Sequence, residues 1–358
     1  MNNRVCGVAI LAALPYFFLG VAHAQSGVSI SGMVDMGLVR ESGGAAGPAT
    51  KLTSGVENGS RIIFRGNEDL GGGNSAVFML ESGFQADTGA LGQGGLLFGR
   101  QAWMGLSSQR WGTLTMGRQY TLNYAIMAQV GDPFLAGLAG VFSNVFSNSG
   151  ARLNNSVKYA TPRLRGWNAE LLYGAGEVAS STKTASSAGA ALAYSAGRLN
   201  ARLGYHYRNN DSATVQDRPP ARNILLAANY DFTFIRPYLA YSINRGPNSS
   251  QLPAANAYGA AVAPVASADS RDLLLGAVVP LGNGKLMLST IHKDDRGVAN
   301  QDATMYAVGY SYFLSKRSDL YISYGYIDNR NGAGYTVNSA IDIGSGNRAF
   351  NLGMRHLF

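Results

Sequence analysis

Apolar and polar residues alternate with a period of two over most of the chain. In RLNARLGYHYR (198–208), for example, the leucines and tyrosines share one parity, and the other carries charged or small residues. Successive side chains of a β-strand point to opposite faces, so this pattern predicts strands with one apolar and one polar face. The chain also ends in this way, because RAFNLGMRHLF (348–358) alternates up to its last residue, Phe358.

Sixteen alternating stretches, an even number, can be placed after residue 27. They cover residues 28–39, 60–66, 75–85, 98–107, 111–119, 154–161, 167–176, 187–196, 198–208, 221–231, 233–244, 271–280, 284–293, 303–314, 318–328 and 348–358. Short turns such as 280–285 and long loops such as 40–59 and 120–153 connect them. Alternating short and long connections are typical of an up-and-down barrel with one elaborated rim.

Two β architectures can produce this alternation. A soluble β-sandwich or propeller turns the apolar face into a core, whereas a transmembrane barrel turns it toward lipid. Lipid accepts only helices and closed barrels, because no backbone polar group can be left unpaired there. Strands of about ten residues, Tyr and Phe near strand ends, and sixteen strands without intervening helices favour the barrel. We therefore predict an all-β, 16-stranded antiparallel transmembrane β-barrel over residues 25–358, with the soluble fold as the alternative.

The N-terminus carries the one apolar run that is long enough to suggest a membrane helix. Arg4 precedes this run, Val5 to Val21 form its core, and Ala22-His23-Ala24 provides a small-x-small cleavage site. These features predict a secretory signal peptide, residues 1–24. A transmembrane anchor is the alternative, but the run is short and Pro15 interrupts it.

Cleavage of this signal would change the composition in two ways. It would remove Cys6, the single cysteine, so the exported chain could form no disulfide. It would also lower the Lys and Arg count from 29 to 28 against 21 Asp and Glu, which leaves a net charge of +7. The basic residues are scattered singly, whereas nucleic-acid-binding proteins usually gather them in a patch. We therefore expect no nucleic-acid partner.

Residue patterns for catalysis or metal binding are missing from the sequence. His206, His292 and His356 lie on separate predicted strands, and neither HxxxH nor CxxC occurs. No GxSxG motif is present, and the glycine runs lack the following helix and Lys-Ser/Thr of a phosphate-binding loop. We predict that the protein is not an enzyme and needs no metal or cofactor. An outer-membrane barrel enzyme is disfavoured on this ground.

Several stretches carry a resemblance to a known family. They are VSISGMVDMGL (28–38), GSRIIFRGNEDLGGGNSAVFMLESGFQADTG (59–89), LFGRQAWMGLSSQRWGTLTMGRQY (97–120), NNSVKYATP (154–162), YFLSKRSDLYISYGYI (312–327) and GMRHLF (353–358). Together they resemble the trimeric general porins of Gram-negative outer membranes, most closely the β-proteobacterial branch. This resemblance implies a homotrimer of 16-stranded barrels, with short periplasmic turns and eight external loops, that lets small hydrophilic solutes and ions diffuse through the outer membrane.

The resemblance also implies that the third external loop folds into the barrel and narrows it to an eyelet. The third long connection is Thr121 to Leu153, which is also the longest. Its GDPF sequence places Asp132, Pro133 and Phe134 where the family has the tip of this loop. An ordinary external loop is the alternative.

Porins line one wall of the eyelet with basic residues. Arg61, Arg100 and Arg118 match the family's motifs, and strand parity adds Arg65 and Lys158 to this predicted pore cluster. A basic residue on the water-filled inner face costs little free energy, whereas an outward arginine at the lipid midplane costs about 2–4 kcal/mol. Each could instead be a solvated wall residue, and Arg118 could brace the third loop or a neighbouring subunit.

The third loop offers little negative charge to oppose this cluster. Asp132 is the one carboxylate between Thr121 and Leu153. One acid facing several arginines would leave a net positive field, which low-dielectric walls would focus along the axis. We therefore predict a preference for anions. A channel specific for one anion or organic acid, and a surface adhesin or structural protein acting through its loops, are the alternatives.

The terminal phenylalanine has an expected role as well. The last strand should pair with the first and close the barrel, so that neither strand keeps an exposed edge. In the porin family a C-terminal aromatic residue is also read by the barrel-assembly machinery, which makes Phe358 a predicted assembly signal. Phe358 and its same-face neighbours should then meet lipid, with Arg355 on the inner face or the periplasmic rim.

Overall fold

The computed structural model describes residues 27–148, 150–250 and 264–358. The predicted signal peptide, residues 1–24, lies outside this part of the chain. Over the described residues the fold is a sheet of seventeen strands. Their bounds are β1 Gly27–Ser42, β2 Ala49–Ser54, β3 Arg61–Gly71, β4 Asn74–Gly83, β5 Gln101–Ser108, β6 Gly112–Tyr120, β7 Arg152–Ala160, β8 Trp167–Gly174, β9 Ser187–Ala196, β10 Leu199–Arg208, β11 Ala221–Tyr230, β12 Arg236–Arg245, β13 Asp269–Leu281, β14 Gly284–Asp295, β15 Ala303–Phe313, β16 Ser318–Asn329 and β17 Arg348–Leu357.

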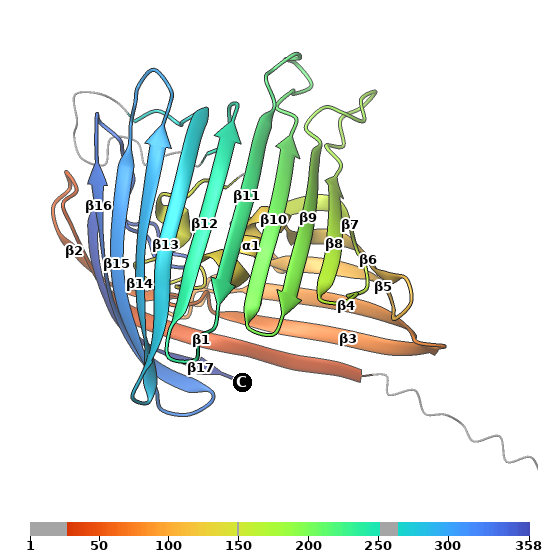
Figure 1. Cartoon of the computed structure of the whole chain (residues 1–358), viewed down its shortest axis with the longest axis horizontal. Helices are drawn as coiled ribbons and strands as arrows, with labels where there is room; N and C mark the ends of the chain where they lie inside the picture. Colours follow the sequence, from red (N-terminus) through yellow and green to blue (C-terminus); the bar gives the residue numbers. More distant parts are fainter. Residues whose placement is uncertain (1–26, 149, 251–263) are drawn as a thin grey trace, which may run out of the picture.

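Neighbouring strands from β3 onward pair antiparallel in chain order, and β17 pairs with β1, which closes the sheet into a barrel. β2 and β3 both pair with β1: β2 with its second half and β3 with its first half. They are therefore two halves of one barrel strand, and the described barrel has the sixteen strands that the sequence predicts. Short turns lie at the lower rim in Figure 1 and the long connections at the upper rim, with the C-terminus at the lower rim.

The interruption between β2 and β3 is a feature that the sequence does not predict. Residues 40–59 were expected to form a loop, but they contain the end of β1, a hairpin and all of β2. The segment between the two halves turns inward, and its Val56 is fully buried. The backbone N–H groups of Val56, Glu57 and Asn58 donate to the carboxylate of Asp35, at 3.1, 3.0 and 2.7 Å. A strand with an inward excursion breaks the alternation, so the sequence pattern predicts a loop at this place.

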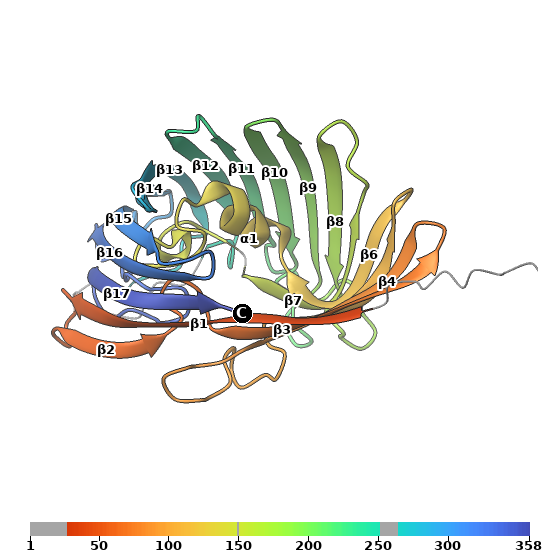
Figure 2. The ribbon, with the colours of Figure 1, turned by 90° about the horizontal axis from the view of Figure 1, so that it is seen from below.

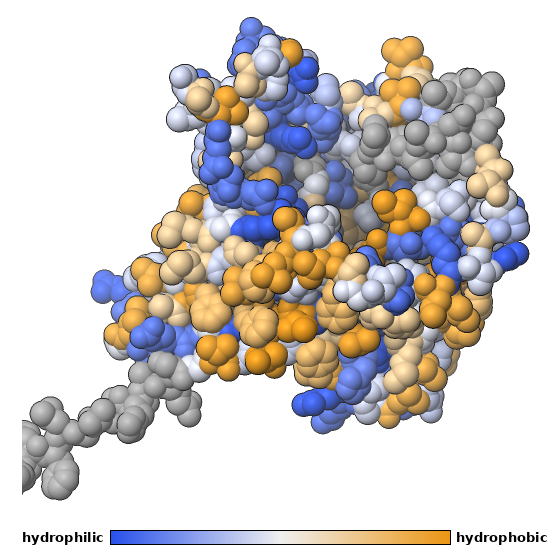
Figure 3. Space-filling model, turned by 180° about the vertical axis from the view of Figure 1, so that it is seen from behind, coloured by the Kyte–Doolittle hydropathy of each residue, from blue (hydrophilic) through white to orange (hydrophobic). Residues whose placement is uncertain are grey.

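The two faces of the sheet differ as in a membrane barrel. In β11 the outward Ile224 and Leu226 are exposed, whereas the inward Asn223 and Leu225 are buried. The face seen in Figure 3 carries a broad band of apolar side chains, with more hydrophilic residues above it. An exposed apolar band that alternates residue by residue with a polar interior is the arrangement of outer-membrane barrels.

The barrel closes at the C-terminal residue. Phe358 and Gly32 exchange two backbone hydrogen bonds, 3.1 Å from the Phe358 N–H and 3.0 Å from the Gly32 N–H. The Phe358 ring lies across Gly32, where a Cβ atom would come within 2.6 Å of the ring. Phe358 is 44% exposed and shares the outward face with Phe350, whereas Arg355 points inward and its Nε donates to Asp319 at 3.1 Å. The predicted closing strand and both of its faces are thus confirmed.

The third long connection folds into the barrel (Figure 2). It contains α1 (Leu122–Ile126), the π-helical turn η1 (Met127–Gly131) and the 3₁₀ turn η2 (Phe142–Asn144). Thr121 caps α1, because its hydroxyl accepts from the Tyr124 N–H at 3.3 Å. Among the described residues, no helix combines the length and apolarity that a membrane crossing would need.

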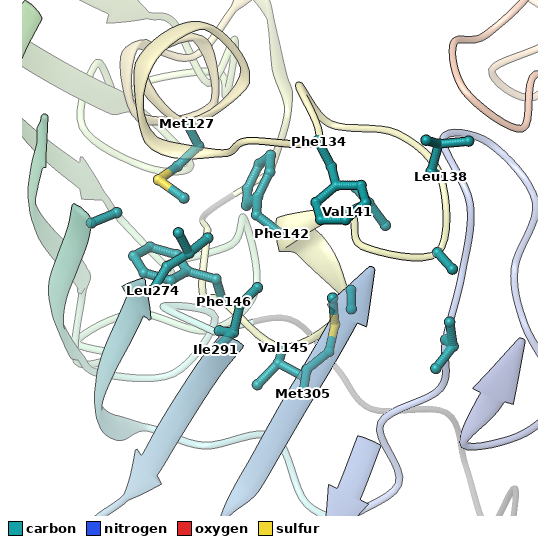
Figure 4. Packing of buried hydrophobic residues seen from close by; sticks show 14 of the residues in the cluster. Met127, Phe134, Leu138, Val141, Phe142, Val145, Phe146, Leu274, Ile291 and Met305 are labelled. Atoms are coloured by element: carbon teal, nitrogen blue, oxygen red, sulfur yellow. The ribbon is translucent and has the colours of Figure 1, made fainter. Parts of the chain in front are cut away.

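Loop 3, residues 121–151, has an apolar core of its own against the barrel wall. Phe134, Phe142 and Phe146 of the loop pack with Leu274 and Ile291 of β13 and β14 (Figure 4). Polar contacts tie the loop to distant parts of the wall. The Leu138 N–H donates to the Val56 carbonyl at 2.8 Å, and the Ser147 N–H donates to the Asp272 carboxylate at 2.7 Å. The inward course of this loop is therefore fixed at several points along its length.

Candidate pore constriction

Loop 3 leaves a cavity of about 630 Å³ between itself and the wall formed by β3 to β7. From the wall and its connections this cavity is lined by Asn58, Gly59, Arg61, Gln85, Gln93, Arg100, Tyr120 and Arg152, and from loop 3 by Tyr124, Ala125, Ala128, Gln129, Leu135 and Ala136. The wall side is therefore basic and rich in amides, and the loop side is largely small and uncharged. None of the residues that line the cavity is an Asp or Glu.

Three arginines form the basic side, and each is held in place by neighbouring groups. Arg61, at the start of β3, donates from Nε to the Gly59 carbonyl at 2.7 Å. Arg100, just before β5, donates from Nη2 to the Tyr120 hydroxyl at 2.9 Å. The guanidinium of Arg152, at the start of β7, lies 4.7 Å from the centre of the Tyr120 ring and donates to the same hydroxyl at 3.2 Å. Tyr120 therefore positions two of the three cations.

One carboxylate lies behind these arginines. Glu81 of β4 is 2% exposed, and its Oε1 accepts from Arg61 Nη1 at 3.1 Å and from Arg100 Nε at 2.7 Å. Its Oε2 accepts from the Gln101 amide at 2.9 Å. Three cations face one buried anion, so the cluster keeps an excess of positive charge beside the cavity. Sequence reasoning missed Glu81, although strand parity places it inward, and missed Arg152, which lies just before the stretch predicted as a strand.

The structure brings together two of the five residues predicted for the pore cluster, Arg61 and Arg100. Arg65 shares the parity of Arg61 but lies further along β3, is exposed and does not line the cavity. Lys158 of β7 also lies outside the lining. Arg118 donates to the Gly99 carbonyl at 2.8 Å and to Asn154. Within β6, Arg118 has the same parity as the residues whose side chains are exposed on the outer face. The structure thus does not place Arg118 in the cluster.

Asp132 does not face the arginines, so that expectation is wrong. Its carboxylate is fully buried within loop 3 and accepts from the N–H groups of Phe134, Ala136 and Phe142 at 2.9, 3.0 and 3.1 Å. Burial outweighs these donors and raises the pKa of Asp132 to about 7. Pro133 lies over Gly276 of β13, and Phe134 belongs to the loop core. The predicted tip residues therefore hold the shape of the loop, and Leu135 and Ala136 border the cavity instead.

A second, smaller cavity of about 140 Å³ borders the other side of α1 and η1. It shares Ala125 and Gln129 with the larger cavity and is also lined by Arg163, Glu170 and Arg202. Basic residues thus outnumber acidic ones along both cavities. Within the described residues, no group of three or more His, Cys, Asp and Glu side chains is placed to hold a metal ion.

Comparison with known proteins identifies the family. A sequence model of the Gram-negative porins matches residues 8–332. The chain belongs to this family. An outer membrane porin of Bordetella pertussis is 30% identical over 399 aligned residues that span both chains completely. Outer membrane porin protein 32 of Delftia acidovorans is 27% identical, again over both full lengths. These relatives fit the predicted β-proteobacterial branch and establish the porin as an outer-membrane channel.

Solved porin structures share the barrel. The anion-selective porin from Comamonas acidovorans superposes with a TM-score of 0.75 at 25% sequence identity, covering 93% of this chain and 100% of that chain. OmpF of Salmonella typhi gives a TM-score of 0.67 at 15% identity over 92% of this chain and 97% of that chain, which shows a common fold.

Proposed function

We propose that this porin is a passive diffusion channel for small hydrophilic solutes that prefers anions. The observation that carries the proposal is the cavity beside loop 3, whose lining contains Arg61, Arg100 and Arg152 but no carboxylate. Because the walls have a low dielectric constant, the field of these cations is focused into the water between the loop and the wall. Anions are concentrated there and cations are depleted.

The arrangement of the lining suits transit better than retention. The arginines lie on three different wall segments, β3, the end of the β4–β5 connection and β7, so an anion can pass from one cation to another. Amide groups of Asn58, Gln93 and Gln129 offer hydrogen bonds to a partly dehydrated solute. Conduction requires sites that attract an ion but release it, which several weak sites achieve and one tight site does not. The anion selectivity named for the Comamonas porin supports the same assignment for this chain.

Planar-bilayer recording tests this function. We expect ohmic single-channel steps and, in a salt gradient at neutral pH, a reversal potential of the sign that anion permeation produces. Cation selectivity would contradict the proposal. Conductance that saturates with one organic acid would instead indicate a channel specific for that acid, and a barrel without conductance would favour the adhesin alternative.

We also propose that the porin works as a homotrimer exported by the signal peptide, residues 1–24. The connection between β4 and β5 protrudes outside the barrel wall (Figure 2). Its Leu91, Leu96 and Leu97 are 42, 48 and 61% exposed. Exposed leucines on a protruding loop support burial against a neighbouring subunit. Native mass spectrometry would check both points: a trimer is expected, with chains that begin at Gln25.

Phe358 supports a further proposal, that the C-terminus is read during assembly by the barrel-assembly machinery. Deletion of Phe358 removes the two hydrogen bonds to Gly32 and the outward terminal ring together. We expect a large loss of folded trimer in the outer membrane, with unchanged conductance for the channels that do form. Phe358→Leu, which keeps the backbone pairing, separates the roles: normal amounts of trimer from this variant would show that the seam alone matters.

A further inference from the structure

The smaller cavity beside loop 3 lies between α1 and the wall formed by β8 to β10. Its volume of about 140 Å³ has room for about four or five water molecules at about 30 Å³ each. α1 rests on this wall at two glycines. A Cβ atom added to Gly189 would come within 3.4 Å of Leu122, and one added to Gly204 within 2.4 Å of Asn123. The cavity opens further along β9 and β10, toward the short turn that joins them, which is the periplasmic side of α1 in a porin.

Strand register shows how polar groups meet in this cavity. Asn168 of β8, Ala193 of β9 and Arg202 of β10 are paired in one row across the wall. Glu170 of β8 stands in the next row, opposite Ala191 of β9. All five side chains point inward and line the cavity. The two alanines are short, so they leave a space between the acid on β8 and the base on β10.

Three charged side chains border this space without using one another as partners. Arg163, from the turn before β8, and Glu170 both lie close enough to Arg202 to interact with it electrostatically. Within the described residues, none of the three forms a hydrogen bond or an ion pair. On the opposite wall, by contrast, Glu81 accepts from three donors. Charges of both signs around one small cavity are therefore free to contact a solute.

The rest of the lining is apolar on one side and carries amides on the other. Leu122 and Ile126 of α1 and Ala193 of β9 are 2, 5 and 4% exposed. The amides of Gln129 and Asn168 complete the lining. The groups present thus match a solute that has a carboxylate, an ammonium group and a short apolar side chain.

We propose that this cavity is a binding subsite for a small zwitterionic amino acid such as alanine. The carboxylate of the solute lies between Arg163 and Arg202, because guanidinium groups match carboxylate oxygens in a bidentate way. Its ammonium group lies beside Glu170. A plain carboxylate would leave Glu170 unpaired and next to a like charge, and an inorganic cation would be repelled by two arginines.

The subsite deepens the proposed function, because it takes the barrel as a channel for small solutes, but it does not depend on the preference for anions. Ala125 and Gln129 line both cavities, so the subsite adjoins the route through the constriction. An amino acid that has passed loop 3 is held there weakly, and the larger cavity stays open. The expected effect is a higher local concentration of amino acids on the periplasmic side of the constriction.

Ligand-observed NMR on the detergent-solubilised porin tests the proposal, with L-alanine and L-lactate as probes. The two solutes differ mainly in having an ammonium group or a hydroxyl. We expect wild type to bind alanine about tenfold more tightly than lactate. Glu170→Gln should lose this difference, because alanine binding falls about tenfold and lactate is no longer repelled. Arg202→Gln should weaken the binding of both solutes.

Three further variants control for charge and for shape. Glu68→Gln and Arg198→Gln remove the same charges from exposed residues near the short-turn rim that do not line the cavity, so both should bind alanine like wild type. Ala193→Leu fills the cavity without changing a charge and should weaken the binding of both solutes. Conductance of each variant in planar bilayers shows that it has folded, and the comparison of the two solutes on wild type needs no variant.

Three results would overturn the proposal. Lactate binding to wild type as tightly as alanine would make the cavity a simple anion site. Equal loss of alanine binding in Glu68→Gln would mean that any acid at this rim acts alike. Alanine binding that is unchanged in Ala193→Leu would place the solute elsewhere.

Salt-gradient recording of wild type separates this inference from the proposed preference for anions. Cation selectivity with alanine binding intact would contradict the preference alone. Anion selectivity without alanine binding would contradict the subsite alone.

Discussion

The inner surface of the barrel carries ionic groups on two different walls, and the two walls use charge differently. Beside β3 to β7, Arg61, Arg100 and Arg152 face a cavity with one buried carboxylate behind them. Beside β13 and β14, Lys293 and Asp272 form a single ion pair at 2.9 Å, and both are 0% exposed. The first wall keeps an excess of positive charge next to water, whereas the two charges on the second wall cancel.

The difference separates a wall that acts on permeating ions from a wall that stabilises the fold. Lys293 also donates to the Ser250 and Ser270 hydroxyls, and Asp272 accepts from the Ser147 N–H of loop 3. The balanced pair therefore fixes the end of the loop to the wall, and its charges are screened from any passing ion. Charge excess at a hydrated surface acts on solutes, whereas balanced charge in a dry contact acts on the fold.

The balanced wall should respond most strongly to substitution. Lys293→Met removes one partner and leaves Asp272 buried without its cation, which typically costs about 3–5 kcal/mol. We expect a lower unfolding temperature for the trimer and noisier channels as the end of loop 3 detaches. Thermal unfolding and single-channel recording would measure the two effects.

The double variant Lys293→Met/Asp272→Leu is the matched control for this effect. Removing both charges leaves no buried charge without a partner, so stability should recover in part. The hydrogen bond from the Ser147 N–H to Asp272 stays lost. If the single and double variants unfold at the same temperature, the pair does not hold the loop in the way described.

On the basic wall, substitutions should change selectivity far more than stability. The Coulomb energy between a unit charge and an ion about 5 Å away in water is about 0.8 kcal/mol, so losing one arginine should lower the anion-to-cation permeability ratio about two- to fourfold. We expect this from Arg152→Gln, which no carboxylate contacts within the described residues. Reversal potentials in a salt gradient would report the change. Lys158→Gln, which removes a cation outside the cavity lining, is the control and should shift the potential little.

Much of the barrel could be predicted from residue order alone. The stretch 187–196 was predicted as a strand and is β9 with the same bounds, because alternation is a local property of the chain. β2 was missed because it has six residues and is followed by an inward excursion at Val56. The seam at Phe358 could be predicted because a closed barrel leaves no other partner for the last strand.

The constriction was only partly predictable, and the reason is tertiary. Arg61 and Arg100 could be found from motifs, but the place of Asp132 depends on how loop 3 folds on itself, which no periodicity encodes. The pairing of Asp272 with Lys293 depends on the register set by the turn between β13 and β14. Parity alone shows that both residues point inward. The ion pair of Asp272 and Lys293 thus cannot be predicted from the sequence, whereas the excess of positive charge at the constriction can.

Glu81 allows a sharper test of the basic wall. Glu81→Gln keeps an acceptor for Arg100 but removes the one negative charge behind the arginines. The net positive charge of the cluster rises, so the preference for anions should increase. Because Glu81 is buried, this increase should be smaller than the decrease caused by the loss of one arginine. Salt-gradient recording would show the shift. A fall in anion preference would mean that Glu81 acts mainly by holding the arginines toward the cavity.

The smallest effect on selectivity is expected from Asp132→Asn, although Asp132 is the one carboxylate of loop 3. Its carboxylate points into the loop, so the reversal potential should stay within error of wild type. Stability should change instead. The pKa of Asp132 is about 7 in the folded loop and about 4 in an unfolded chain, so the folded state holds the proton more tightly. The stabilisation of the folded state that results is fully present below pH ~4 and is lost as pH rises toward 7. The Asn variant should lack this pH dependence of stability.

Thermal unfolding at several pH values, beside the salt-gradient recordings, measures both properties on the same protein. If Asp132→Asn moved the reversal potential as far as Arg152→Gln does, the carboxylate would have to face the water of the passage. Loop 3 would then carry charge for conduction as the basic wall does, and the division between a wall that acts on solutes and contacts that shape the fold would fail at this residue.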